Sequence, residues 1–146
     1  MNDKRRQLLL DAAAPLLEAD EKVEITTIAN VGSVSVKKKV LTAAVAGIAT
    51  GGLVTANVRP RQMYVILTDR KILFFDADTS SGRPGKHMAT LSREGVSSTE
   101  PKSAMLGLAL GIELSIAGQE RDLKIVFPKP SKEEGQQFAV SLPRSL

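Results

Sequence analysis

The sequence predicts an antiparallel α+β domain, and three observations support this fold class. Apolar residues alternate with polar ones in several runs between residues 23 and 127, which is typical of strands with one buried face. These runs follow one another in hairpin order, which favours an antiparallel sheet over alternating βαβ units. Helical spacing appears only near the two ends of the chain. We therefore expect a helix, five or six strands, and a final helix.

Length and composition fit one domain with an aliphatic core. The chain has 146 residues, 42% of them hydrophobic, with no tryptophan, one tyrosine and four phenylalanines. Because cysteine is absent, disulfides, iron–sulfur clusters and thiol nucleophiles are excluded, which fits a reducing cytoplasm. Asp11 interrupts the first apolar run after three leucines, so we expect no signal peptide.

The N-terminal part predicts a helix and then a strand. Apolar spacing indicates a helix over Asp3–Leu17, with a break or a new helical start at Pro15. A strand follows, and its buried face consists of Val23, Ile25, Thr27, Ala29 and Val31. The apolar register changes after Gly32, which predicts a bulge or bend there.

A tight hairpin is expected in the middle of the chain. Met63–Thr68 and Lys71–Phe75 are two β-rich runs that flank a turn at Asp69 and Arg70. The segment TSSGRPGK reads as a loop, and a weaker strand is expected over Met88–Ser92.

The strongest alternation lies further on, and a helix follows it. A strand is predicted from the alternating residues Leu106, Leu108, Leu110, Ile112, Leu114 and Ile116, and the next strand from Leu123, Ile125 and Phe127. Ser131 and Glu134 form a capping-box signature for a final helix that has Phe138 and Leu142 on one face.

An apolar segment, Val40–Val58, interrupts this pattern between basic residues. Lys37, Lys38 and Lys39 precede it, and Arg59 and Arg61 follow it. These five cations are the candidate site for an anion or for anionic lipid. Three readings of the segment stay open: packing within the domain or an oligomer, a monotopic or hairpin contact with a membrane, and a true membrane span.

Small residues within the segment favour self-association. Ala43, Gly47, Gly51 and Thr55 recur every four residues, and the two glycines form a GxxxG pair. Such spacing lets two backbones approach closely. These four residues are the candidate self-association surface.

The residues that usually carry catalysis are sparse. His87 is the single histidine, and a surface role at a strand end is expected for it. Asp69, Asp76 and Asp78 are explained as turn and strand-end residues rather than as a metal site. The sequence shows no nucleotide-binding glycine pattern and no nucleophile elbow, so we expect neither an enzyme nor a cofactor.

Nucleic acid is a less favoured partner. The pI near 9.5 suits such binding. However, Tyr64, Phe74 and Phe75 lie among apolar neighbours and are expected in the core, where they cannot stack on bases.

Three stretches resemble bacterial pleckstrin-homology-like domains: APLLEADEKVEI, YVILTDRKILFF and LSIAGQERDLKIVFPKPSKEEGQQFAVSL. The resemblance covers roughly residues 16–143. It implies a β-sandwich or partial barrel of two nearly orthogonal antiparallel sheets, with a C-terminal helix whose Phe138 and Leu142 plug one open end. Residues 1–20 would be an N-terminal helical segment, and residues 21–143 the domain itself. The apolar Gly/Ala-rich insertion at 37–61 departs from the family pattern.

The resemblance also implies a function. Eukaryotic relatives bind phosphoinositides or peptides, and bacterial members look like assembly or membrane-associated modules. We therefore expect a non-catalytic cytoplasmic module that binds a copy of itself or another protein. The alternative is peripheral binding to an anionic membrane through residues 37–61.

Overall fold

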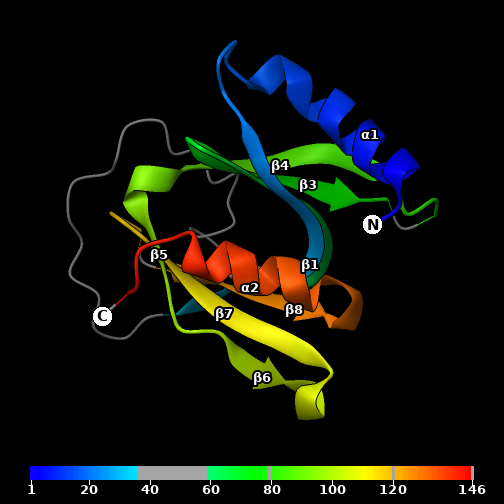
Figure 1. Ribbon diagram of the computed structural model, residues 1–146. Coiled ribbons are helices and arrows are strands. Elements are labelled where there is room, and N and C mark those ends of the chain that lie inside the picture. The colour runs from blue at the N-terminus through cyan, green and yellow to red at the C-terminus, as the bar shows by residue number, and fades with distance from the viewer. Residues whose placement is uncertain (36–58, 79, 120, 146) are drawn as a thin grey trace.

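The computed structural model describes residues 1–35, 59–78, 80–119 and 121–145, and Figure 1 shows their arrangement. These residues confirm the predicted class, because antiparallel strands lie between an N-terminal and a C-terminal helix. In chain order the elements are α1 (Asp3–Ala13), the 3₁₀ turn η1 (Ala14–Leu16), β1 (Val23–Ser35), β2 (Arg61–Thr68), β3 (Lys71–Ala77), β4 (Pro84–Ser92), η2 (Arg93–Gly95), β5 (Val96–Ser98), β6 (Lys102–Ala104), η3 (Met105–Gly107), β7 (Ala109–Ile116), β8 (Arg121–Pro128), η4 (Lys129–Ser131) and α2 (Lys132–Val140).

One antiparallel sheet contains the eight strands of the described residues. Its order is β4-β3-β2-β1-β8-β7-β5, and β6 also pairs with β7. β1 joins the two halves, since it pairs with β2 from Val23 to Val31 and with β8 from Asn30 to Ser35. β2 and β3 form the predicted hairpin, with Asp69 and Arg70 as the two residues between them.

Both faces of β2 and β3 are covered, which explains their continuous apolar sequence. On one face, Val65 and Phe74 belong to the main core together with Phe138 of α2. On the other face, Tyr64 and Phe75 pack in a second cluster with Leu9 of α1. Tyr64, Phe74 and Phe75 are therefore core residues, as the sequence predicts.

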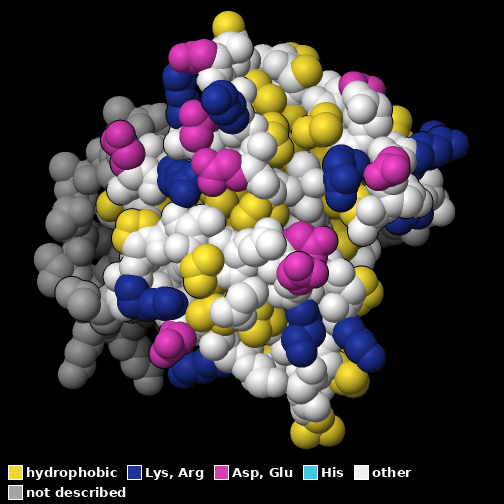
Figure 2. Space-filling model, in the orientation of Figure 1, with side chains coloured by type: hydrophobic (Ala, Val, Ile, Leu, Met, Phe, Trp, Pro, Cys, Tyr) yellow, Lys and Arg dark blue, Asp and Glu magenta, His cyan; other side chains and the backbone are white. Residues whose placement is uncertain are grey.

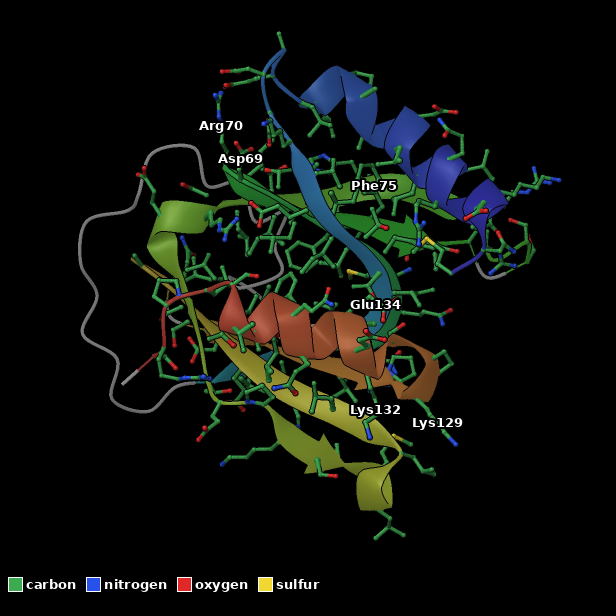
Figure 3. All side chains as sticks on the ribbon, in the orientation of Figure 1. Asp69, Arg70, Phe75, Lys129, Lys132 and Glu134 are labelled. Carbon is green, nitrogen blue, oxygen red and sulfur yellow. The ribbon has the colours of Figure 1, made fainter. Side chains whose placement is uncertain are left out.

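Polar contacts attach residues 18–22 to the β2–β3 turn. The Lys22 amide donates to Asp69 Oδ1 over 3.0 Å, and the Asp69 amide donates to the Lys22 carbonyl over 3.0 Å. Arg70 binds the carboxylates of Glu18 and Asp20, and the turn lies near the end of α1 in Figure 3. This turn holds the segment between α1 and β1 against the sheet.

Of the bulge or bend predicted at Gly32, the bulge is wrong. Gly32 pairs with Lys124 in a ladder to β8 that runs without a shift from Asn30 to Ser35. The shift in β1 lies near its start instead, opposite β2. Gly32 serves a close approach, because a Cβ there would lie 2.9 Å from the Pro60 nitrogen. Its missing side chain lets the chain that enters β2 pass directly against β1.

The strand predicted through Leu106 and Leu108 begins only after these residues. Met105 and Leu106 have φ angles of 51° and 57°, and Gly107 has 90°, so the backbone turns where the pattern predicts an extended chain. Leu106 is fully exposed and Leu108 is 56% exposed. The predicted alternation of buried and less buried residues is confirmed within β7. However, apolar alternation in a sequence cannot distinguish a strand from a turn that points its side chains into solvent.

Two short strands, β5 and β6, are absent from the sequence prediction. Each has three residues, which is too short for alternation to be recognised. β5 pairs with the C-terminal half of β7, and β6 pairs with its N-terminal half, next to the η3 turn. The segment from β5 to η3 therefore lies along β7.

The C-terminal helix forms, but not with the predicted cap. Ser131 precedes α2, yet its side chain makes no capping hydrogen bond. The 3₁₀ turn η4 leads directly into the helix, and the Lys132 amide donates to the Lys129 carbonyl. Phe138 and Leu142 are buried as expected, and the Phe138 ring packs 5.9 Å from the Phe127 ring, centroid to centroid.

Gly135 gives a test of the contact between α2 and the sheet. A Cβ at this position would lie 2.5 Å from two carbons of the Phe127 ring. Alanine normally stabilises a helix by about 1 kcal/mol relative to glycine. In Gly135→Ala we expect the opposite sign, a loss of about 1–3 kcal/mol in the free energy of unfolding, because the helix must move off the ring. Urea unfolding measures this loss.

Gln136→Ala is the matched control, since Gln136 is exposed in the same helix. It should leave the free energy of unfolding nearly unchanged. If Gly135→Ala stabilises the protein, the close packing of α2 on Phe127 is wrong.

Candidate functional site

Most residues of the two predicted sites lie outside the described residues. This applies to Lys37, Lys38 and Lys39 of the anion site, and to the whole self-association set, Ala43, Gly47, Gly51 and Thr55. Arg59 and Arg61 are described, and both are exposed. Arg61 forms a salt bridge with Asp76 over 2.7 Å, so its charge is already partly compensated.

Other basic residues of the middle region also serve the fold. Arg70 binds Glu18 and Asp20, and Lys71 lies 3.0 Å from Glu21, whose side chain is fully buried. Part of the positive charge in this region therefore pairs with carboxylates of residues 18–22 and attaches that segment to the sheet. Pairs of this kind lower the field that a ligand would meet.

A basic cleft at the start of α1 is a better candidate for an anion site. It is a hollow of about 220 Å³, lined by Asn2, Lys4, Arg5, Leu8, Ser81 and Arg83. Three of these residues are cationic, and none carries a carboxylate. Figure 2 shows Lys and Arg side chains around this end of α1, with an acidic side chain between them. Asp3, in the same helical turn, forms a salt bridge with Arg6 over 3.7 Å.

The β3–β4 loop, which forms one wall of the cleft, is held by its own hydrogen bonds. Asp78 accepts from the Ser80 hydroxyl over 2.6 Å, the Ser80 amide over 2.8 Å and the Ser81 amide over 3.1 Å. The Tyr64 hydroxyl donates to the Gly82 carbonyl. Gly82 has a φ of 72°, and a Cβ there would lie 3.1 Å from Arg5 Nη2. These bonds hold Ser80, Ser81 and Gly82 in place, and the Arg5 guanidinium lies against Gly82.

These bonds also explain the ionisation of Asp78. The Ser80 hydroxyl and amide, and then the Ser81 amide, hold the pKa of Asp78 below its usual value of 3.8. The carboxylate is directed to the loop and not to the arginines. Within the described ranges, no salt bridge joins Lys4, Arg5 or Arg83 to a carboxylate.

Sequence reasoning missed this cleft for a physical reason. Lys4 and Arg5 are separated from Arg83 by almost 80 residues, so no local spacing connects them. They come together because the second apolar cluster packs α1 against β2 and β3. The run of charges at residues 4–6 was the available signal, but it does not reveal which loop lies opposite.

A second hollow lies between α1, β1 and α2 and carries both signs of charge. It has a volume of about 390 Å³, and its lining includes Arg6, Glu24 and Glu134. Figure 3 shows Glu134 on the side of α2 that faces this space. Because the charges are mixed, this hollow selects neither an anion nor a cation.

The candidate metal residues do not come together. Asp69 accepts from the Lys22 amide, Asp76 pairs with Arg61, and Asp78 accepts within its loop. His87 lies inside β4, half-buried, 5.3 Å from the Phe75 ring between centroids, and not at a strand end as predicted. Within the described ranges there is no cluster of three or more residues that could hold a metal ion.

The comparisons with known proteins give little further information. No family model matches the chain. No curated protein matches it either. Among solved structures, it is similar to the hSac2 domain from human phosphoinositide phosphatase Sac2, with a TM-score of 0.44 and 13% identity, over 97% of this chain and 80% of that one. Separately, none of the helices in the described ranges is long and apolar enough to cross a bilayer.

The pKa of Asp78 can be tested directly. An NMR titration of its carboxyl carbon should give a midpoint below 3.8, and Ser80→Ala should raise the midpoint by removing the strongest donor. Because the folded pKa is lowered, the contribution of Asp78 to stability is present above pH 3.8 and is lost as the pH falls through the lowered value. Ser141→Ala, a distant hydroxyl change, is the control. A midpoint at or above 3.8 in the unaltered protein would contradict the loop geometry.

Proposed function

We propose that this chain is a non-catalytic binding and assembly module with a pleckstrin-homology-like fold, and that its ligand carries a phosphate group. The observation that carries the ligand proposal is the basic cleft, where three cations and no carboxylate line one hollow. Phosphate is the anion that arginine and lysine bind best together, through paired hydrogen bonds and charge.

The packing of the sheet supports the proposed fold. A single core contains Val65 and Phe74 from one half of the sheet, and Leu114 and Ile125 from the other. Residues from both halves meet in this way when a sheet curves onto itself, as in a sandwich or partial barrel. α2 adds Phe138 to the same core, as the helix of a pleckstrin-homology-like domain would.

The geometry of the cleft supports reversible binding of a small anionic group. Lys4, Arg5 and Arg83 are exposed, so a ligand can enter without displacing a buried side chain. Ser80 and Ser81, opposite α1, are already held by hydrogen bonds to Asp78, so binding has little conformational entropy to overcome at these residues. Exposed charges are screened by salt, and we therefore expect an affinity that falls as ionic strength rises.

The test is an NMR titration with inorganic phosphate, following the amide signals of Ser81 and Gly82. Arg83→Gln should weaken binding by about tenfold, because it removes a charged donor from the cleft. Arg144→Gln is the matched control, since Arg144 is exposed and bridges β5 on the other side of the molecule (Figure 1). Equal affinity in both variants, or no shift of the loop amides, would overturn the proposal.

A parallel titration identifies the source of the phosphate group. Vesicles of phosphatidylcholine with phosphatidylserine present the group on a lipid, and free phosphate presents it alone. Binding to vesicles that Arg83→Gln weakens indicates a headgroup ligand. Binding to free phosphate with no such vesicle effect indicates a soluble ligand.

Assembly is the second part of the proposal and rests on the sequence pattern. Ala43, Gly47, Gly51 and Thr55 recur at a spacing that lets backbones pack closely. We expect the purified chain to scatter light as a particle of several times 15.6 kDa. Gly51→Leu should reduce that mass, because the larger side chain separates the backbones. A monomer mass before any substitution would exclude self-association through this segment.

A further inference from the structure

An apolar turn projects from the molecule between β6 and β7. Met105 is 69% exposed, Leu106 is fully exposed and Leu108 is 56% exposed. Within the described ranges, these are three of five exposed large apolar side chains, and they lie within four residues. We call Met105–Leu108 the apolar tip. It forms the lower end of the molecule in Figure 1, around η3.

The backbone of the tip is fixed in an unusual conformation. Met105 and Leu106 both lie in the left-handed region, which glycine and asparagine adopt far more readily than leucine. The Leu108 amide donates to the Met105 carbonyl over 3.1 Å and closes the turn. β6 and β7 pair directly behind it, up to Ala104 and Ala109. The fold therefore holds leucine outward at a position where a polar residue would be less strained.

Lysines surround the base of the tip. Lys132 Nζ donates to the Gly107 carbonyl over 3.0 Å, which places its charge at the turn itself. Lys129 lies beside Lys132, between α2 and the tip, in Figure 3. Lys102 is exposed and lies in β6, three residues before Met105. None of these lysines forms a salt bridge with a carboxylate in the part of the chain that the structure describes.

The combination of apolar and basic groups restricts what can cover the tip. Figure 2 shows apolar side chains at this end with Lys and Arg next to them, and the acidic side chains of the first turn of α2 lie beyond these cations, further from the apolar end. In a symmetric dimer of tips, each lysine would face the same lysines of the other copy, which is repulsive. An anionic bilayer offers both an apolar interior and negative headgroups, so it complements both groups at once.

From this complementarity we infer that the apolar tip enters the surface of an anionic bilayer, with Lys102, Lys129 and Lys132 on the headgroups. The tip is only four residues long, so its contact is confined to the headgroup and upper acyl region. The contact needs both components, because neither a few apolar side chains nor a few lysines alone bind a membrane stably. This site is separate from the basic cleft and does not depend on it.

Because the chain contains no tryptophan, a single introduced one reports on the tip alone. Leu108→Trp is suited to this, since Leu108 has an ordinary φ of −80°. With vesicles of phosphatidylcholine and phosphatidylserine, its emission should shift to the blue, and lipids brominated on the acyl chain should quench it. Val140→Trp is the matched control, because Val140 is exposed on α2. Its emission should not change. Equal behaviour of the two tryptophans would overturn the inference.

Leu106→Asn separates a role in binding from a role in folding. Asparagine adopts the left-handed region readily, so the thermal stability should stay the same or rise. Vesicle partitioning in a sedimentation assay should fall by about tenfold, because the apolar side chain is lost. Val140→Asn should leave partitioning unchanged. A loss of stability with unchanged partitioning would show that the leucine serves the fold and that the inference is wrong.

Removing one lysine charge, and adding salt, both test whether the lysines beside the tip contribute to vesicle binding. Lys129→Gln should lower partitioning into phosphatidylserine vesicles by about fivefold, and added salt should lower it in the unaltered protein. Pure phosphatidylcholine vesicles should bind poorly. If partitioning does not depend on phosphatidylserine, or if Leu106→Asn instead lowers an oligomer mass measured by light scattering, the bilayer is not the partner of the tip.

Discussion

β1 pairs with two different strands, and this double pairing holds the two halves of the sheet together. This strand of 13 residues bonds to β2 along its first part and to β8 along its last part. The β2–β3 hairpin and the β7–β8 hairpin, which flank β1 in the sheet, therefore belong to one sheet, although they are distant in sequence. Gly32 makes the crossing feasible, because Pro60, directly before β2, lies where the side chain of another residue would stand. Among the described strands, β1 is the one that pairs with both halves of the sheet.

Burial follows from that arrangement. The main core contains side chains from both halves of the sheet and from α2. α1 covers the opposite face of β2 and β3. Arg93 reinforces the contact between distant parts, since it donates to Glu24, to the Thr68 carbonyl and to the Ser141 carbonyl at 2.8–2.9 Å. The N-terminal segment, the central hairpin and the end of α2 are thus connected by one side chain, which favours a cooperative unit.

The basic residues divide into two groups with different roles. Arg61, Arg70, Lys71 and Arg93 form salt bridges with carboxylates, so their charge stabilises contacts within the chain. The cations of the cleft and those beside the apolar tip form no salt bridge with a carboxylate among the described residues. The start of α1 and the tip lie apart in Figure 1, so the molecule presents two distinct basic surfaces. Net charge alone cannot show this division, since it counts all cations equally.

Short stretches of residues already predict the fold class, the central hairpin with its turn at Asp69 and Arg70, and the inward faces of β7 and β8. These features depend on local period and turn chemistry, which a single stretch of chain contains. The packing of distant segments, by contrast, sets where the apolar pattern stops being buried, as at Leu106, and which distant cations share a cleft, as Arg5 and Arg83 do. It also decided that β5 and β6 are strands, because three residues acquire that structure from a neighbour. Burial and charge pairing are properties of surfaces that meet, and no segment specifies alone what it will meet.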